Sequence, residues 1–143
     1  MAVSGPKSIY DRYRIVMSVI YSIPCINSRL LGVVTTIDAG AGNGLLVLLA
    51  GSTVICSITL QKPSGTASGG VLTFTAPLLG TAAAAGSVTT AQLLDSTGAV
   101  VVSGLTAGIP LSGADVIISN GLNSTFINTA QSVQILSAQI TGS

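Results

Sequence analysis

The acids and bases that catalysis needs are scarce in this chain. It has no histidine and no glutamate, and its only carboxylate side chains are Asp11, Asp38, Asp95 and Asp115. Each of the four lies at a predicted turn or element end, where aspartate commonly stabilises a turn. Most general acid–base arrangements are therefore excluded. A Ser–Lys pair through Lys7 or Lys62 is the one nucleophilic arrangement that the composition leaves open. We expect that the protein is not an enzyme.

Residues that bind metals and cofactors are equally few. Cys25 and Cys56 cannot fill a structural zinc site without histidine, and we expect both to be unpaired thiols. The aspartates are far apart in sequence, so only a spatial convergence of Asp95 and Asp115 would make a calcium site. The glycine-rich segment 40–44 lacks the Lys-Ser/Thr ending of a phosphate-binding loop and predicts a turn. We expect no metal and no cofactor.

Charge is the most unusual property of the composition. Only 6% of the 143 residues are charged, against about 25% in an ordinary soluble domain. The net charge of +1 provides no basic stripe, so we expect no nucleic-acid partner. A surface with so little charge is poorly protected against association. Much of it is therefore expected to face other protein chains or, as an alternative, lipid.

The mean hydropathy of +0.78 makes a membrane protein an alternative to consider. A spanning helix needs about 20 predominantly apolar residues. The apolar run 15–23 stops at Pro24, and the uncharged segment 75–94 is mostly Ala, Thr, Gly and Ser. We therefore expect no membrane partner, and a small membrane protein is retained only as an alternative.

Short runs with a period of two predict an all-β domain. They recur about every ten residues between glycine-rich segments, which is typical of a β-sandwich or small barrel. The predicted strands are residues 54–61, 72–76, 100–102, 116–118 and 133–140. In the first run, the residues expected to face inward are Val54, Cys56, Ile58 and Leu60.

Two connections and one irregularity within a strand are predicted from turn residues and from the apolar alternation. Asn120-Gly121 is a two-residue hairpin signal. The apolar phase slips by one after Ile135, which predicts a bulge or kink. Segment 63–70 is rich in Gly, Ser and Pro and is expected to form a surface loop.

One short helix is predicted before the strands. Asn27 or Ser28 would be its N-cap, and Gly40 would end it. Its core-facing residues at helical spacing are Leu30, Leu31, Val34 and Ile37. The β-branched pair Thr35-Thr36 weakens this prediction.

Residues 1–26 are expected to form an N-terminal arm, and residues 27–143 the β-sandwich domain. The arm contains all three tyrosines and three of the five cations, and Tyr and Arg are enriched at protein interfaces. The residues that we predict to contact a partner are Tyr10, Arg12, Tyr13 and Arg14. Segment 9–21 fits either a helix or a strand, and the alternative is an arm that packs on its own sandwich.

Turn-and-strand motifs recur from about residue 28 to residue 141. They are segments 37–45 (IDAGAGNGL), 67–74 (ASGGVLTF), 94–101 (LDSTGAVV), 112–116 (SGADV) and 133–141. Together they resemble motifs of the small jelly-roll capsid cement or decoration proteins of tailed bacteriophages, a group that includes a cement protein of a short-tailed Bordetella phage. The chain departs from that pattern in its long arm. It also departs in segment 87–93, which lacks the usual aromatic and basic residues.

The resemblance implies an all-β, jelly-roll-like sandwich that dimerises on the outer capsid surface and bridges neighbouring capsomers. Its partners would be the major capsid protein and a second copy of itself. Its location would be the virion, after assembly in the host cytoplasm. The alternatives are a tail, collar or fibre-base protein, and a carbohydrate- or receptor-binding β-sandwich on the virion.

Overall fold

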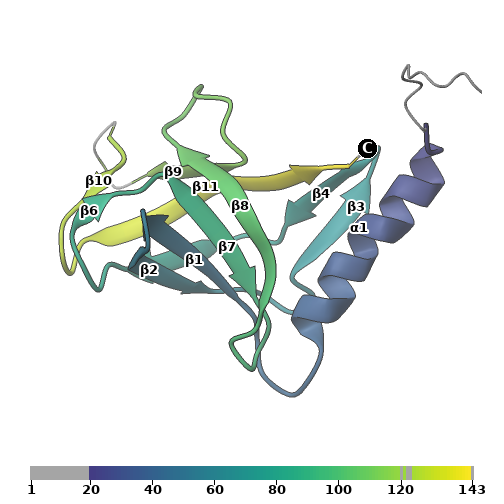
Figure 1. Cartoon of the computed structure of the whole chain (residues 1–143), viewed down its shortest axis with the longest axis horizontal. Coiled ribbons are helices and arrows are strands. Elements are labelled where there is room, and N and C mark those ends of the chain that lie inside the picture. Colours follow the sequence, from purple (N-terminus) through teal and green to yellow (C-terminus); the bar gives the residue numbers. More distant parts are fainter. Residues whose placement is uncertain (1–19, 120, 122–123, 143) are drawn as a thin grey trace, which may run out of the picture.

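The computed structural model describes residues 20–119, 121 and 124–142. This part consists of one helix beside a strongly curled sheet (Figure 1). The elements are α1 (Ile23–Asp38), β1 (Leu45–Ala50), β2 (Thr53–Thr59), β3 (Gly65–Ser68), β4 (Val71–Phe74), β5 (Leu78–Thr81), β6 (Gly86–Ser87), β7 (Thr90–Leu94), β8 (Val100–Gly108), β9 (Val116–Ser119), β10 (Phe126–Ile127) and β11 (Ser132–Thr141).

The main sheet has nine strands in the order β2-β1-β7-β8-β9-β11-β4-β3, with β5 also paired to β11. All of its pairs are antiparallel except β8–β9, which is parallel. The long strand β11 is central to this arrangement. Its first half pairs with β5 and β9, and its second half pairs with β4. One strand therefore connects the two ends of the molecule.

Strand β5 brings the curled sheet back toward its own edge at β2. Ala83, just after β5, donates its backbone N–H to the carbonyl of Ile55 at 2.8 Å. Gly80 makes the close approach possible, because a Cβ there would lie 2.8 Å from Ile58 Cγ1 and 2.9 Å from Cys56 Sγ. The result is a half-barrel whose interior is filled by apolar side chains.

Helix α1 covers the remaining side of the half-barrel. It packs against β3, β4 and β8, and its buried residues are Ile26, Leu30, Val34 and Ile37. Near the C-terminus, Gly142 lies against Ile26 and donates its N–H to Gly70 at 2.8 Å. Figure 1 shows this end of the chain beside the first turns of the helix. The all-β, sandwich-like fold with one short helix is thus confirmed.

The helix starts earlier than predicted. Ser22, not Asn27 or Ser28, is the N-cap, and its Oγ accepts a hydrogen bond from the N–H of Cys25 at 3.3 Å. Pro24 in the first turn is compatible with this start, because the first helical N–H groups have no partner within the helix. Residues 23–26, which we assigned to the arm, therefore form the first turn of α1.

Most of the predicted helix face is correct, and the helix ends where expected. Leu30 is buried, whereas Leu31 is 45% exposed on the other side of α1. Gly40 follows the helix at φ +88°. Thr35 and Thr36 donate their hydroxyls to the carbonyls four residues earlier, at 3.0 and 2.8 Å, so both hydroxyls are satisfied within the helix.

The predicted locations of the strands are correct more often than the predicted direction, inward or outward, of their side chains. The slip after Ile135 is a bulge, as predicted, although Leu136 is 52% exposed rather than inward-facing. A second bulge lies in β2, opposite Leu48 and Leu49 of β1, and it changes which residues of β2 face inward. Because of it Val54 is 46% exposed and Ile55 is buried.

Two predicted connections were wrong. Segment 63–70 is not a loop, because β3 lies within it and pairs with β4. The turn between them is Gly69-Gly70, both at positive φ, which is a two-residue hairpin signal in the sequence that we did not use. Strands β9 and β10, which flank the predicted Asn120-Gly121 hairpin, do not pair with each other. Strand β9 pairs with β8 and β11, and the next strand, β10, pairs with β6.

Candidate functional site

The residues predicted to contact a partner lie outside the described part of the chain. These are Tyr10, Arg12, Tyr13 and Arg14. The described chain begins at Ile20, which is 91% exposed and directly precedes α1. The described surface nearest to the predicted contact residues is therefore the one around Ile20 and the start of α1.

The solvent-facing side of α1 is almost free of charge. We call it the outer helix face, and its exposed residues from Pro24 onward are Pro24, Cys25, Ser28, Arg29, Leu31, Gly32, Thr35 and Thr36. The solvent side of a surface helix normally carries charged and polar residues. Among the exposed residues of α1 only Arg29 is charged, and its guanidinium carbon lies 4.6 Å from the centre of the Tyr21 ring. Tyr21 and Ile23, both about half exposed, extend this uncharged surface toward residue 20.

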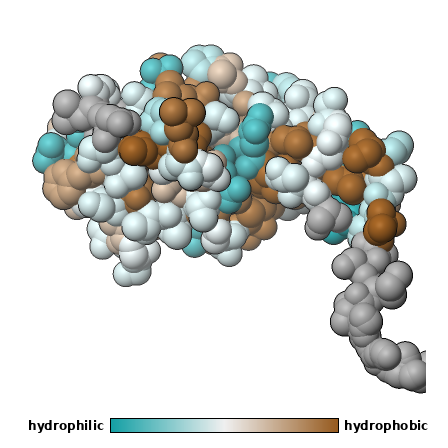
Figure 2. All heavy atoms as spheres, turned by 90° about the horizontal axis from the view of Figure 1, so that it is seen from above, coloured by the Kyte–Doolittle hydropathy of each residue, from teal (hydrophilic) through white to brown (hydrophobic). Residues whose placement is uncertain are grey.

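The face of the molecule seen in Figure 2 has a similar character away from the helix. Figure 2 shows mostly pale side chains of intermediate hydropathy, with separate apolar patches and few strongly hydrophilic areas. The described part of the chain also exposes several large apolar residues away from the helix, including Leu79, Leu111 and Phe126. Desolvating such a surface costs little, because few ionised groups must lose their water.

One cluster at the end of α1 contains a lysine and a serine, the two residue types that a Ser–Lys mechanism would need. Asp38 at the end of α1 accepts the backbone N–H of Ser64 at 3.0 Å, and Lys62 is two residues earlier in the chain. The Lys62 ammonium donates to the carbonyls of Gly40 and Gly42 at 2.7 and 3.2 Å. The sequence alone could not indicate this cluster, because 26 residues separate Asp38 from Ser64 and 22 residues separate Gly40 from Lys62.

The geometry of this cluster suits a structural junction. Ser64 is 0% exposed, so no substrate reaches its hydroxyl in this conformation. The Lys62 ammonium is directed at the two carbonyls of segment 40–44. The segment 40–44 thus presents carbonyl groups to a lysine, and a phosphate needs N–H groups instead. Asp38 Oδ1 and Ser64 Oγ are buried without a hydrogen-bond partner, which is compatible with a buried water at this junction.

The two later aspartates stabilise loops and do not converge. Asp95 Oδ1 accepts hydrogen bonds from the Thr97 hydroxyl at 2.6 Å and from the Ala99 N–H at 3.0 Å, and these bonds lower the pKa of Asp95. Asp115 Oδ2 accepts from the N–H and the hydroxyl of Thr106, both at 3.1 Å. Most of β8 separates the two carboxylates, a distance on the order of 20 Å. Within the described ranges, no three metal-binding side chains form a group.

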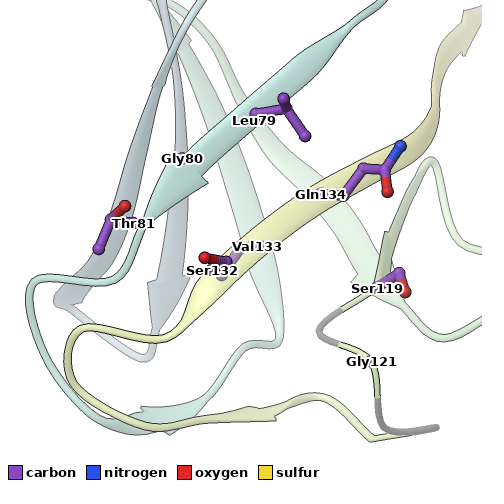
Figure 3. A pocket seen from close by; sticks show the side chains of 8 residues that line it. All are labelled: Leu79, Gly80, Thr81, Ser119, Gly121, Ser132, Val133 and Gln134. Atoms are coloured by element: carbon purple, nitrogen blue, oxygen red, sulfur yellow. The ribbon is translucent and has the colours of Figure 1, made fainter.

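A pocket of about 650 Å³ lies on the outer face of β5, β9 and β11. Figure 3 shows the lining residues of β11 between those of β5 and the end of β9. Cross-strand pairing places Gln134 between Leu79 and Ser119, and Ser132 beside Thr81. The described lining residues are uncharged: Leu79, Gly80, Thr81, Ser119, Gly121, Ser132, Val133 and Gln134. Such a lining offers hydroxyl and amide groups for hydrogen bonds and carries no charge.

Both cysteines are free thiols, as predicted, with Cys25 exposed and Cys56 buried. Across the described residues, no helix is both long enough and apolar enough to cross a bilayer.

No family model, no curated protein and no solved structure matches this chain.

Proposed function

We propose that this chain is a structural protein of a tailed-phage virion. In this proposal it is a capsid cement or decoration protein, without enzymatic activity, that binds the outer capsid surface and stabilises contacts between capsomers. Its partners are the major capsid protein and a second copy of itself, and neither nucleic acid nor membrane is a partner. The proposal combines the sequence resemblance with the physical character of the surface.

The observation that carries the proposal is the outer helix face. A free protein rarely leaves sixteen residues of surface helix with one exposed charge, because charge on that side protects against association. This face adjoins Ile20, where the arm with its tyrosines and arginines joins the described chain. A cement protein needs such a surface of complementary shape and low desolvation cost, repeated on a lattice so that many contacts add. A stable contact of this kind buries on the order of 1,000 Å² or more.

Rebinding to shells that lack the protein tests the role of the arm. Purified full-length protein should bind such shells saturably. Deleting residues 1–14 should weaken binding by at least tenfold while the circular dichroism spectrum keeps its β-sheet form, because the deletion ends before the described fold begins. Unchanged occupancy of the shells by the shortened chain would refute the contact predicted for Tyr10, Arg12, Tyr13 and Arg14.

A matched pair of surface variants tests the outer helix face. Leu31 on α1 and Val54 on β2 are 45% and 46% exposed, so lysine at either position reaches solvent with similar ease. Leu31→Lys should lower shell binding severalfold, because the new charge must be desolvated at the contact. Val54→Lys should bind like the original chain. Equal binding by both variants would remove the outer helix face from the proposal.

A carbohydrate- or receptor-binding role is the second candidate, and the pocket on β5, β9 and β11 favours it. Its volume lies in the range of small-molecule sites. Within the described part of the chain, the side chains of Gln134, Ser119 and Ser132 make no hydrogen bond, so they are available to a neutral polar ligand. Titration with maltotriose followed by NMR should then shift the Gln134 side-chain amide signals and the backbone amide signals of the other lining residues, and Gln134→Ala should abolish the backbone shifts. No shift at millimolar sugar would count against this role for that sugar class.

A further inference from the structure

The loop between β8 and β9 presents a leucine that is both exposed and strained. Leu111 is fully exposed at 103%, and its φ of 70° lies in the left-handed region. A bulky side chain rarely adopts this conformation, because its Cβ comes too close to the following carbonyl. Glycine or asparagine would be more favourable for the backbone, and a polar residue would be more favourable for solubility. Within the described part of the chain, the fully exposed Leu111 side chain buries no apolar surface that would offset the strain.

The loop is built to hold that leucine in place. At its end, Asp115 and Thr106 exchange hydrogen bonds: the Asp115 N–H donates to Thr106 Oγ1 at 2.9 Å, and Asp115 Oδ2 accepts from Thr106 at 3.1 Å. At its tip, the N–H of Ser112 donates to the carbonyl of Ile109 at 3.1 Å, which closes a turn around Leu111. Figure 1 shows the loop projecting beyond the sheet between β8 and β9.

Two unfavourable features at one anchored position point to a partner that offsets both. Burying the leucine side chain in an apolar socket would stabilise the complex through the hydrophobic effect. That gain would offset the free-energy cost of the strained backbone. The pocket on β5, β9 and β11 is a poor socket for it, because hydroxyl, amide and glycine groups line most of that pocket. A second copy of this chain is therefore a weaker candidate than a different protein.

We propose that the Ile109–Asp115 loop is a second contact point, which inserts Leu111 into an apolar socket of the protein that carries this chain. This inference rests on the proposed function, under which that partner is the major capsid protein. The loop and the outer helix face belong to different elements of the fold, and under this proposal both contact the same partner. Each would be weak alone, and their combination would fix the orientation of the chain on its partner.

The test compares two asparagine variants that relieve the same kind of strain. Ala130 is also exposed and has a φ of 67°, so Ala130→Asn is the matched control for Leu111→Asn. Both variants should unfold at a higher temperature than the original chain, because asparagine tolerates the left-handed region. Only Leu111→Asn should lose affinity for shells that lack the protein, by tenfold or more. Leu111→Met, which keeps an apolar side chain, should retain most of the binding.

Three outcomes separate this inference from the proposed function. Selective loss of binding in Leu111→Asn, with retention in the other two variants, supports the contact loop. Full binding by Leu111→Asn, while the original chain binds saturably, overturns the contact loop and leaves the proposed function standing. Failure of the original chain to bind any shell overturns both. Circular dichroism of each variant verifies that a loss of binding is not a loss of fold.

Discussion

The carboxylate of Asp38 accepts a hydrogen bond at 3.0 Å from the backbone N–H of Ser64, and this bond joins the end of α1 to the start of β3. A negative charge at a helix C-terminus is unfavourable with respect to the helix dipole. Its presence there is explained by the buried N–H, which would otherwise lack a partner. The helix is thereby held against the open side of the half-barrel, and the outer helix face acquires a fixed position.

Removing this acceptor should destabilise the fold. Asp38→Ala leaves the Ser64 N–H buried without a partner, which costs about 1–3 kcal/mol of unfolding free energy. Asp38→Asn keeps an acceptor oxygen and should cost less. Urea denaturation of the three proteins measures the differences, and equal stability of Asp38→Ala and the original chain would contradict the structural role of the junction.

Closure of the half-barrel should depend on the absence of a side chain at Gly80. Gly80→Ala places a methyl group 2.8 Å from Ile58 Cγ1, so β5 must move away from β2, at a cost of about 1–3 kcal/mol. Gly32→Ala is the control, because a Cβ on Gly32 meets no atom within 4 Å. In the middle of a helix this second change should stabilise by up to about 1 kcal/mol. Opposite signs of the two changes in thermal denaturation are expected, and equal effects would argue against the closure.

The Asp95 turn should give the fold a specific acid sensitivity. Its hydrogen bonds, first that from the Thr97 hydroxyl and then that from the Ala99 N–H, lower the pKa of Asp95 from the ordinary 3.8. A carboxyl whose pKa is lower in the folded state stabilises the fold when ionised. This contribution is complete at pH values above the unfolded pKa, and it is lost as the pH falls through the lower folded pKa.

Comparison with Asp95→Asn isolates that contribution. The difference in unfolding free energy between the two proteins should be constant from pH 7 down to about pH 5, and should shrink below about pH 4. Urea denaturation at several pH values measures it. A difference that is the same at pH 7 and pH 2.5 would show that the ionised form of Asp95 has no special role.

The two thiols should differ sharply in reactivity. Cys25 is exposed, whereas Cys56 is completely buried, and burial raises the pKa of the Cys56 thiol and disfavours the reactive thiolate. A disulfide reagent at pH 8 should therefore label one thiol per chain at once, and the second only as the chain unfolds. In Cys25→Ser the fast phase should disappear. Rapid labelling of that variant without denaturant would place Cys56 at the surface.

Local sequence patterns predicted where the helix and strands lie better than which of their residues face the core. Leu30, Val34 and Ile37 were correctly placed in the core because helical spacing alone defines that face. Val54 was placed on the wrong face because one bulge in β2, set by pairing with β1, reverses the alternation. A bulge depends on the partner strand, so a single run of residues contains little sign of it.

The sites were harder to predict than the fold. The junction of Asp38 with Ser64 depends on topology, since 26 residues separate them. The strain at Leu111 depends on the backbone of its loop, and the sequence Pro-Leu-Ser-Gly indicates only a turn. The predicted contact residues Tyr10, Arg12, Tyr13 and Arg14 lie outside the described residues, so their role stays a prediction.

The number of copies per particle tests the central claim most directly. Quantitative mass spectrometry of purified virions would compare this chain with the major shell protein. The proposal predicts a ratio near one, which means hundreds of copies spread over the capsid lattice. A dozen to a few dozen copies would place the chain in a tail, collar or fibre base instead, and its absence from particles would contradict the virion assignment altogether.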